Sequence, residues 1–238
     1  MNPELMTEVA TKEEEVTRHA SSARMGSSFF IRVALTAIAL IIWFWSQKLI
    51  GARGAPTIAI GDRLQDFTAP VNLYLHAHPS AASLLLIVSS GIIDLLGIFL
   101  LARWIFGGSR RPFLGLVIVL GLRQIIQSLV ALPAPPNSIW HYPGFPSLLV
   151  TYSVSNDYFF SGHTAIAVLA VTEIARLRKH WLTALGIFVA IFEIATVLAL
   201  RAHYTMDVFT GIVTGLYAAY LAGWISAALN RVRIGREF

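Results

Sequence analysis

Apolar residues occur along this chain in six long runs, separated by polar segments or by segments rich in proline and glycine. The runs cover residues 29–50, 82–106, 113–132, 161–177, 181–200 and 208–229. A helix needs about 20 apolar residues to cross the ~30 Å hydrocarbon layer of a bilayer. The pattern therefore predicts an all-α, polytopic membrane protein built as a bundle of six transmembrane helices.

The polar segments complete the predicted organisation. Residues 1–27 are polar and are expected to form an N-terminal cytoplasmic tail. Residues 28–230 are expected to form one transmembrane catalytic domain, and residues 231–238 a basic cytoplasmic C-terminus. Two long loops, 51–81 and 133–157, interrupt the runs, and the second is rich in proline and aromatic residues.

The distribution of positive charge predicts the orientation. Six spans place both termini on one side of the membrane, and cytoplasmic loops carry an excess of Lys and Arg. Thirteen of the 18 Lys and Arg residues fall on the side of the termini and four on the other, while Arg123 lies inside the third run. Both termini are therefore expected to be cytoplasmic. This pattern accounts for the net charge of +5 without a nucleic-acid partner.

Composition agrees with a membrane protein and limits the chemistry. The chain is 56% hydrophobic and 13% charged, whereas soluble domains carry about 25% charged residues. It contains no cysteine, which excludes disulfide and thiolate chemistry.

Two polar motifs lie at the exoplasmic ends of the fourth and sixth runs. The second motif is Arg201-Ala202-His203-Tyr204-Thr205-Met206-Asp207. His203 and Asp207 are four residues apart, so on a helix they share one face. Asp207 would accept a hydrogen bond from one imidazole nitrogen and leave the other basic, as a nucleophile or general base requires. The alternative is that Asp207 only caps a helix N-terminus.

The first motif is Asp157-Tyr158-Phe159-Phe160-Ser161-Gly162-His163-Thr164. Ser161 is a candidate helix cap, and Gly162 allows a ligand to approach the backbone. A helix N-terminus favours phosphate, and His163 would protonate a leaving-group oxygen there. Two such histidines support phosphoryl transfer through a phosphohistidine, with no metal or other cofactor expected. The alternative for His163 is a hydrogen bond to a neighbouring loop.

These two motifs resemble the third and fourth signature motifs of the sphingomyelin synthase family. That family includes the plant phosphatidylcholine:diacylglycerol cholinephosphotransferases and lies within the type 2 phosphatidic acid phosphatase superfamily. The segment 123–135, from Arg123 to a Leu-Pro-x-Pro sequence, resembles the second motif, and residues 62–70 weakly resemble the first. The resemblance covers roughly residues 60–225.

The resemblance implies a role for each matching residue. His203 would be the nucleophile that takes the phospho-headgroup, and Asp207 would orient and polarise it. His163 would protonate the departing diacylglycerol and then deprotonate the acceptor hydroxyl. The chain departs from the family where Ser155-Asn156 replaces the usual Cys-Gly. It also lacks the K-x6-R-P and S-R-x5-H motifs of the phosphatases that act on soluble headgroups.

The expected activity is membrane phosphotransfer on the exoplasmic (periplasmic or lumenal) face. Phosphocholine or phosphoethanolamine would move from a phospholipid to a lipid alcohol, either diacylglycerol or ceramide. The nearest alternative is a lipid phosphatase or a phospholipase C-type hydrolase that uses water at the same site. A non-catalytic lipid-binding protein is a third class, and a homo-oligomer is left open.

Seven residues are candidates for substrate binding: Asp94, Arg123, Asp157, Tyr158, Ser161, Gly162 and Tyr204. Arg123 lies about nine residues, roughly 14 Å, below the exoplasmic end of its run. It is expected either to balance phosphate charge or to pair with Asp94. Asp157 would orient the first motif or Arg201.

Other features leave alternatives open. An ionisable group inside a span is usually paired or functional. Glu193 is expected to be structurally paired or protonated, and Glu173 is expected to pair locally with Arg176 or Arg178.

The aromatic residues near the first motif form either an interfacial belt or a cage for a choline or ethanolamine cation. They are Trp140, Tyr142, Tyr158, Phe159 and Phe160.

Straight helices would place His163 and His203 at depths in the membrane that differ by about 10 Å. A tilt of the helices or an early end of the fifth run must remove this difference.

Overall fold

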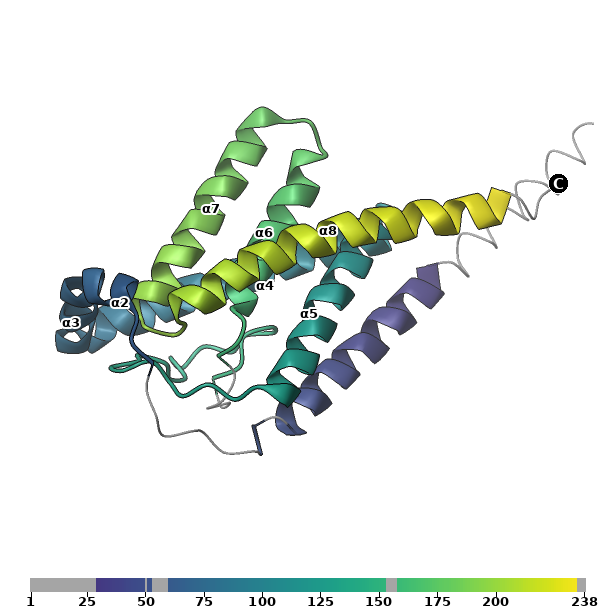
Figure 1. Ribbon diagram of the computed structural model, residues 1–238. Coiled ribbons are helices and arrows are strands. Elements are labelled where there is room, and N and C mark those ends of the chain that lie inside the picture. The colour runs from purple at the N-terminus through teal and green to yellow at the C-terminus, as the bar shows by residue number, and fades with distance from the viewer. Residues whose placement is uncertain (1–28, 50, 53–59, 153–157, 235–238) are drawn as a thin grey trace, which may run out of the picture. The chain divides into compact units, whose positions relative to one another are not determined.

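The computed structural model describes residues 29–49, 51–52, 60–152 and 158–234, which contain helices and connecting segments but no strands. The chain divides into two compact units, Met1–Ile41 and Ile42–Phe238, and the fold of the second is described by itself. Its helices are α2 (Arg63–Phe67), α3 (Ala69–Ala77), α4 (Pro79–Ile105), α5 (Arg111–Leu129), α6 (Gly162–Ala175), α7 (His180–Ala199) and α8 (Thr205–Ile234) (Figure 1). The helix Phe29–Leu49 precedes them and contains the boundary between the units.

Five helices of the described chain are long and apolar enough to cross a membrane. They are Phe29–Leu49, α4, α5, α7 and the Thr205–Arg231 part of α8. The sixth predicted span, 161–177, forms α6, which has 14 residues. At 1.5 Å per residue α6 is about 21 Å long, less than the hydrocarbon thickness. The structure therefore supports a multi-pass membrane protein with five candidate spans. The predicted tail, 1–27, lies outside the described residues.

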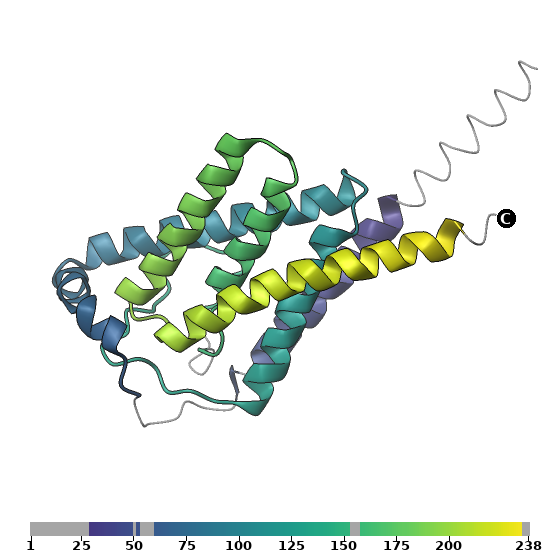
Figure 2. The same cartoon turned by 45° about the horizontal axis from the view of Figure 1, so that its top comes forward.

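Helix α6 lies at the centre of the second unit. It contacts α4, α5, α7 and α8, and Figures 1 and 2 show it flanked by α7 and α8. Ala165, Ala167 and Leu169 on α6 are fully buried. Irregular backbone at membrane depth is tolerated where protein covers it. The surrounding helices thus allow a short α6 whose N-terminus opens inside the fold.

Two glycines let α8 pack closely on α6. A Cβ atom at Gly211 would lie 2.7 Å from the carbonyl oxygen of Ser161, and one at Gly215 would lie 2.7 Å from that of Ala165. Small residues four apart allow helix backbones to approach in membranes. This contact places the N-terminus of α6 beside the first turns of α8, so the two polar motifs meet.

The predicted loop 51–81 is wrong for part of its length, because residues 63–77 form α2 and α3. Asp62 caps α2 by accepting hydrogen bonds from the backbone N–H groups of Leu64 (3.0 Å) and Gln65 (3.4 Å). Pro70 stands in the first turn of α3, where its missing N–H costs nothing. Asn72 on α3 donates to the carbonyl oxygen of Ala199 (3.0 Å), which ties α3 to the end of α7.

The two glutamates inside predicted spans have defined partners. Glu173 on α6 pairs with Nε of Arg111 at 3.4 Å, and its side chain is 2% exposed. The predicted local pair with Arg176 or Arg178 is therefore wrong, because α5 brings a closer cation. Glu193 on α7 accepts a hydrogen bond from Ser89 on α4 (2.6 Å), which supports a structural pairing.

Candidate active site

The second motif begins at a sharp reversal of the chain after α7. The N–H of Arg201 donates to the carbonyl oxygen of Leu198 (3.1 Å), and that of Ala202 donates to the carbonyl oxygen of Val197 (2.9 Å). Arg201 adopts a left-handed conformation with φ of 50°. This is a Schellman motif, which ends α7 and turns the chain back. Helix α7 ends at Ala199, one residue before the predicted end of its run, so an early helix end does not account for the expected depth difference of about 10 Å.

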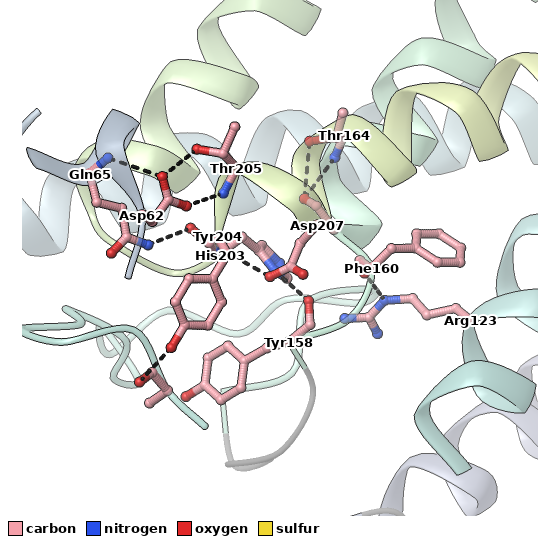
Figure 3. A network of polar contacts seen from close by, with 12 residues as sticks. Asp62, Gln65, Arg123, Tyr158, Phe160, Thr164, His203, Tyr204, Thr205 and Asp207 are labelled. Atoms are coloured by element: carbon pink, nitrogen blue, oxygen red, sulfur yellow. Dashed lines mark hydrogen bonds and ion pairs between the residues drawn. The ribbon is translucent and has the colours of Figure 1, made fainter. Parts of the chain in front are cut away.

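The imidazole of His203 is oriented by a backbone carbonyl. Its Nδ1 atom lies 2.7 Å from the carbonyl oxygen of Tyr158 and 3.6 Å from Oδ2 of Asp207 (Figure 3). A proton on Nδ1 is donated to Tyr158, which leaves Nε2 with its lone pair. The expected acceptor was Asp207, but its carboxylate lies beyond hydrogen-bond distance of the ring. His203 itself is buried.

Asp207 connects the two motifs and caps α8. Its Oδ2 atom accepts a hydrogen bond from the N–H of Tyr204 (2.9 Å), as the cap alternative predicted. Its backbone carbonyl accepts from the N–H of Ser161 (3.1 Å) at the start of α6. The side chain is fully buried, and within the described residues its Oδ1 atom has no hydrogen-bond partner. A buried carboxylate next to His203 would stabilise positive charge on that ring.

The first turn of α6 presents His163. Ser161 is the N-cap of α6, as expected, because its hydroxyl accepts from the N–H (3.3 Å) and the hydroxyl (3.0 Å) of Thr164. His163 is 7% exposed, and its Nε2 atom has no partner among the described residues. Its ring meets that of Trp140 edge to face at a centroid distance of 5.6 Å.

Arg123 lies directly against Gly162. A Cβ atom on Gly162 would stand 3.0 Å from Nε of Arg123, so a larger residue there would require the guanidinium to shift by a few tenths of an ångström. The same Nε donates a hydrogen bond to the carbonyl oxygen of Phe160 (3.1 Å). Arg123 is 6% exposed, and burial among these groups keeps its charge near the N-terminus of α6.

These groups surround one small cavity of about 40 Å³. Its polar lining includes Arg123, His163 and His203, and its aromatic lining includes Trp140 and Tyr158. Other walls are apolar and come from Ile93, Leu120, Leu149 and Ile166. Two basic rings and a guanidinium around a buried space match an anionic phosphoryl group that reacts away from bulk water.

Other predicted residues support the site rather than line the cavity. Asp94 accepts hydrogen bonds from the hydroxyl of Ser147 (2.9 Å) and from the N–H groups of Leu148 (2.8 Å) and Leu149 (2.9 Å). It therefore fixes the loop that forms one wall, and its role in binding substrate stays a prediction. Asp157 lies outside the described residues.

The structure also shows where Tyr204 and the aromatic residues near the first motif lie. The hydroxyl of Tyr204 donates to the carbonyl oxygen of Ala134 (3.3 Å), and burial raises its pKa. Tyr158 and Phe160 are buried in the protein, which does not fit an interfacial belt, whereas Tyr142 is 60% exposed. Trp140 packs against Tyr152 and His163 and lines the cavity, as Tyr158 does, so both rings are candidates for contact with a substrate cation.

Sequence reasoning noted residues 62–70 only as a weak resemblance and assigned no role to Asp62 or Gln65. Gln65 donates a hydrogen bond to the carbonyl oxygen of His203 (3.2 Å), and Asp62 accepts one from the N–H of Thr205 (2.5 Å). A signal was present, because an acidic residue followed three positions later by glutamine is typical of a capped helix start.

A protein-family model described as AtPDCT1/2 matches residues 62–224. Phosphatidylcholine:diacylglycerol cholinephosphotransferase 1 of Arabidopsis thaliana is 23% identical over 171 residues, covering 72% of this chain and 56% of the relative. Phosphatidylcholine:diacylglycerol cholinephosphotransferase 2 of the same plant is 25% identical over 120 residues, covering 50% of this chain and 39% of the relative. The matches thus span about half the length of these curated relatives or less. No solved structure matches the chain.

Proposed function

Because the chain belongs to the AtPDCT1/2 family, we propose that it transfers phosphocholine from phosphatidylcholine to diacylglycerol. The names of the two relatives supply the donor, the group and the acceptor. One observation in the site carries the proposal: His163 and His203 line the same buried cavity as Arg123. Such a site suits a reaction in which one histidine attacks phosphorus and the other handles a proton.

The proposed reaction has two steps. Nε2 of His203 attacks the phosphorus of phosphatidylcholine, and the bond between phosphorus and the glycerol oxygen breaks. The negative charge of the bound phosphate favours the protonated form of His163, which gives its proton to that oxygen. Diacylglycerol then leaves while phosphocholine remains on His203. The hydroxyl of a second diacylglycerol then attacks phosphorus and passes its proton to His163. The bond between phosphorus and Nε2 breaks, and both histidines return to their starting states.

The other residues have distinct proposed tasks. The carbonyl of Tyr158 holds the proton of His203 on Nδ1, 2.7 Å away, so that Nε2 faces the substrate. Asp207 stabilises the positive charge that develops on this ring as it attacks. Arg123 neutralises the phosphoryl oxygens, and Trp140 would contact the choline cation through its π face.

The acceptor and the membrane face are part of the proposal. His163 is 7% and His203 4% exposed, and a shielded site favours a lipid alcohol over bulk water as acceptor. Hydrolysis by the same residues is the competing reaction. The distribution of positive charge supports a site on the exoplasmic face. Phosphoethanolamine is the alternative transferred group, and ceramide is the alternative acceptor.

Reconstituted protein with phosphatidylcholine labelled in its choline group tests the proposal. Label is expected in a new phosphatidylcholine species when diacylglycerol of distinct acyl composition is added, and an acid-labile phosphoprotein is expected when it is omitted. His203→Ala should abolish both signals and His163→Ala should slow both, whereas the surface variant His141→Ala should retain them. Label that appears only as free phosphocholine would identify a hydrolase, and full activity in His203→Ala would refute the nucleophile.

A further inference from the structure

The carboxylate of Asp62 caps two helices at once. Oδ1 accepts from the N–H of Leu64 at the start of α2 and from the hydroxyl of Thr205 at the start of α8 (2.7 Å). Oδ2 accepts from the N–H of Thr205 (2.5 Å), as Figure 3 shows. Asp62 therefore joins α2 to the helix that begins two residues after His203.

Gln65 extends this connection to His203 itself. Its side-chain amide donates to the carbonyl oxygen of His203 (3.2 Å), and Gln65 is 3% exposed. Its backbone carbonyl accepts from Nη2 of Arg201 (3.1 Å). Residues 201, 203 and 205 are thus all bonded to the segment that carries Asp62 and Gln65.

The position of His203 in the chain explains why such support matters. His203 lies between the end of α7 at Ala199 and the start of α8 at Thr205, so it is outside both helices. Its ring is held by Tyr158, but that bond does not fix the depth of the backbone. An error of about 1 Å in the position of a reacting group can cost roughly 100-fold in rate.

We propose that Asp62 and Gln65 form a clamp that holds the turn carrying His203 at the depth where its Nε2 atom meets the cavity. The inference rests on the proposed function, in which His203 is the nucleophile. Neither Asp62 nor Gln65 lines the cavity, so both are positioning residues. The clamp also gives helix α2 a part in the reaction.

Four variants test the clamp. Asp62→Asn removes the charge at nearly constant volume, and Thr205→Val removes only the hydroxyl bond to Asp62. Thr205→Ser restores that hydroxyl. Asp66→Asn is the matched control, because Asp66 lies on α2, the helix that Asp62 caps, and is exposed. Asp62→Asn is expected to lower kcat by about 100-fold. The KM for phosphatidylcholine should change little, since the lining of the cavity is intact.

The serine and valine variants separate positioning from folding. Thr205→Val should lower kcat without a matching loss of folded protein, and Thr205→Ser should recover most of it. If kcat falls only in proportion to folded protein, or if Asp62→Asn behaves as Asp66→Asn does, the clamp is refuted.

Amide hydrogen exchange measures how firmly the clamp holds the backbone, without an assay of turnover. Amides of residues 201–207 are expected to exchange faster in Asp62→Asn than in the wild type or in Asp66→Asn. Unchanged exchange would overturn the clamp even if transfer is confirmed. Conversely, absence of transfer by the wild-type protein would overturn the proposed function, while faster exchange would still show that Asp62 holds this turn.

Discussion

The imidazole Nδ1 of His203 lies 2.7 Å from the carbonyl oxygen of Tyr158, a residue 45 positions earlier in the chain. A backbone carbonyl can accept a hydrogen bond from this N–H at any pH at which the protein folds, since the carbonyl does not titrate. The tautomer of His203 is therefore set by the segment that precedes α6. Asp207, 3.6 Å from the same nitrogen, is left with an electrostatic task.

Asp207→Asn should consequently retain more activity than His203→Ala. The amide keeps an oxygen for the N–H of Tyr204 but loses the negative charge next to the ring. We expect kcat to fall by roughly 100-fold, the loss typical of one preorganised electrostatic contact. Steady-state transfer rates for both variants, normalised to folded protein, measure the difference. Equal and complete inactivity would assign the orientation of His203 to Asp207 instead of Tyr158.

Gly162→Ala should impair the site through Arg123. The new methyl group would lie 3.0 Å from Nε of Arg123 and would shift the guanidinium from its position beside the N-terminus of α6 by a few tenths of an ångström. A loss of about 10- to 100-fold in kcat/KM is expected, with the fold preserved. Gly121→Ala is the control, because a Cβ at Gly121 meets nothing within 4 Å. If both alanine variants are equally active, Arg123 does not need its position over Gly162.

The helices and the two polar motifs could be predicted from sequence because both depend on local patterns. Apolar runs mark spans, but the helix face expected for His203 and Asp207 does not form, because α8 begins at Thr205 and His203 precedes it. The acceptor for His203 could not be predicted, because the carbonyl of Tyr158 has no side-chain signature. The left-handed conformation of Arg201 could not be predicted either. Arginine rarely adopts a positive φ, and a tertiary contact to Gln65 supports this conformation here.

The short α6 shows a second limit of local patterns. Residues 161–177 read as a span from hydropathy alone, yet the helix covers only Gly162–Ala175. Hydropathy cannot distinguish a helix that faces lipid from one enclosed by other helices. The spacing of Gly211 and Gly215 on α8 was the available signal for such enclosure.

Gly211→Ala should destabilise the protein and reduce transfer together. A methyl group there would lie 2.7 Å from the carbonyl oxygen of Ser161, a backbone atom that cannot rotate away. Separation of α8 from α6 is expected to cost about 1–3 kcal/mol. Thermal unfolding in detergent measures this cost, and Gly91→Ala on α4 serves as a control in open space. An unchanged Tm would show that α8 does not depend on close approach at Gly211.

Trp140 should determine the preference for choline. Its ring stands beside His163 in the lining of the cavity, and cation–π contacts contribute about 0.5–2 kcal/mol. Trp140→Leu is expected to lower kcat/KM for phosphatidylcholine by roughly 3- to 30-fold, with a smaller effect on phosphatidylethanolamine. Tyr142→Leu, at an exposed ring, is the control. An equal loss for both lipids would limit Trp140 to packing against His163.

Asp62 should contribute to stability down to unusually acidic pH. Burial alone would raise its pKa, but hydrogen bonds from Thr205, Leu64 and Gln65 outweigh burial and hold the pKa below the ordinary value of 3.8. A carboxylate with a depressed folded-state pKa stabilises fully above its unfolded pKa and loses this contribution as pH falls through the folded value. The Tm difference between wild type and Asp62→Asn should therefore be constant from about pH 7 to pH 5 and shrink only below about pH 4. Asp66→Asn should show little difference throughout. A Tm difference that declines between pH 7 and pH 5 would mean that Asp62 is not held as a carboxylate by Thr205.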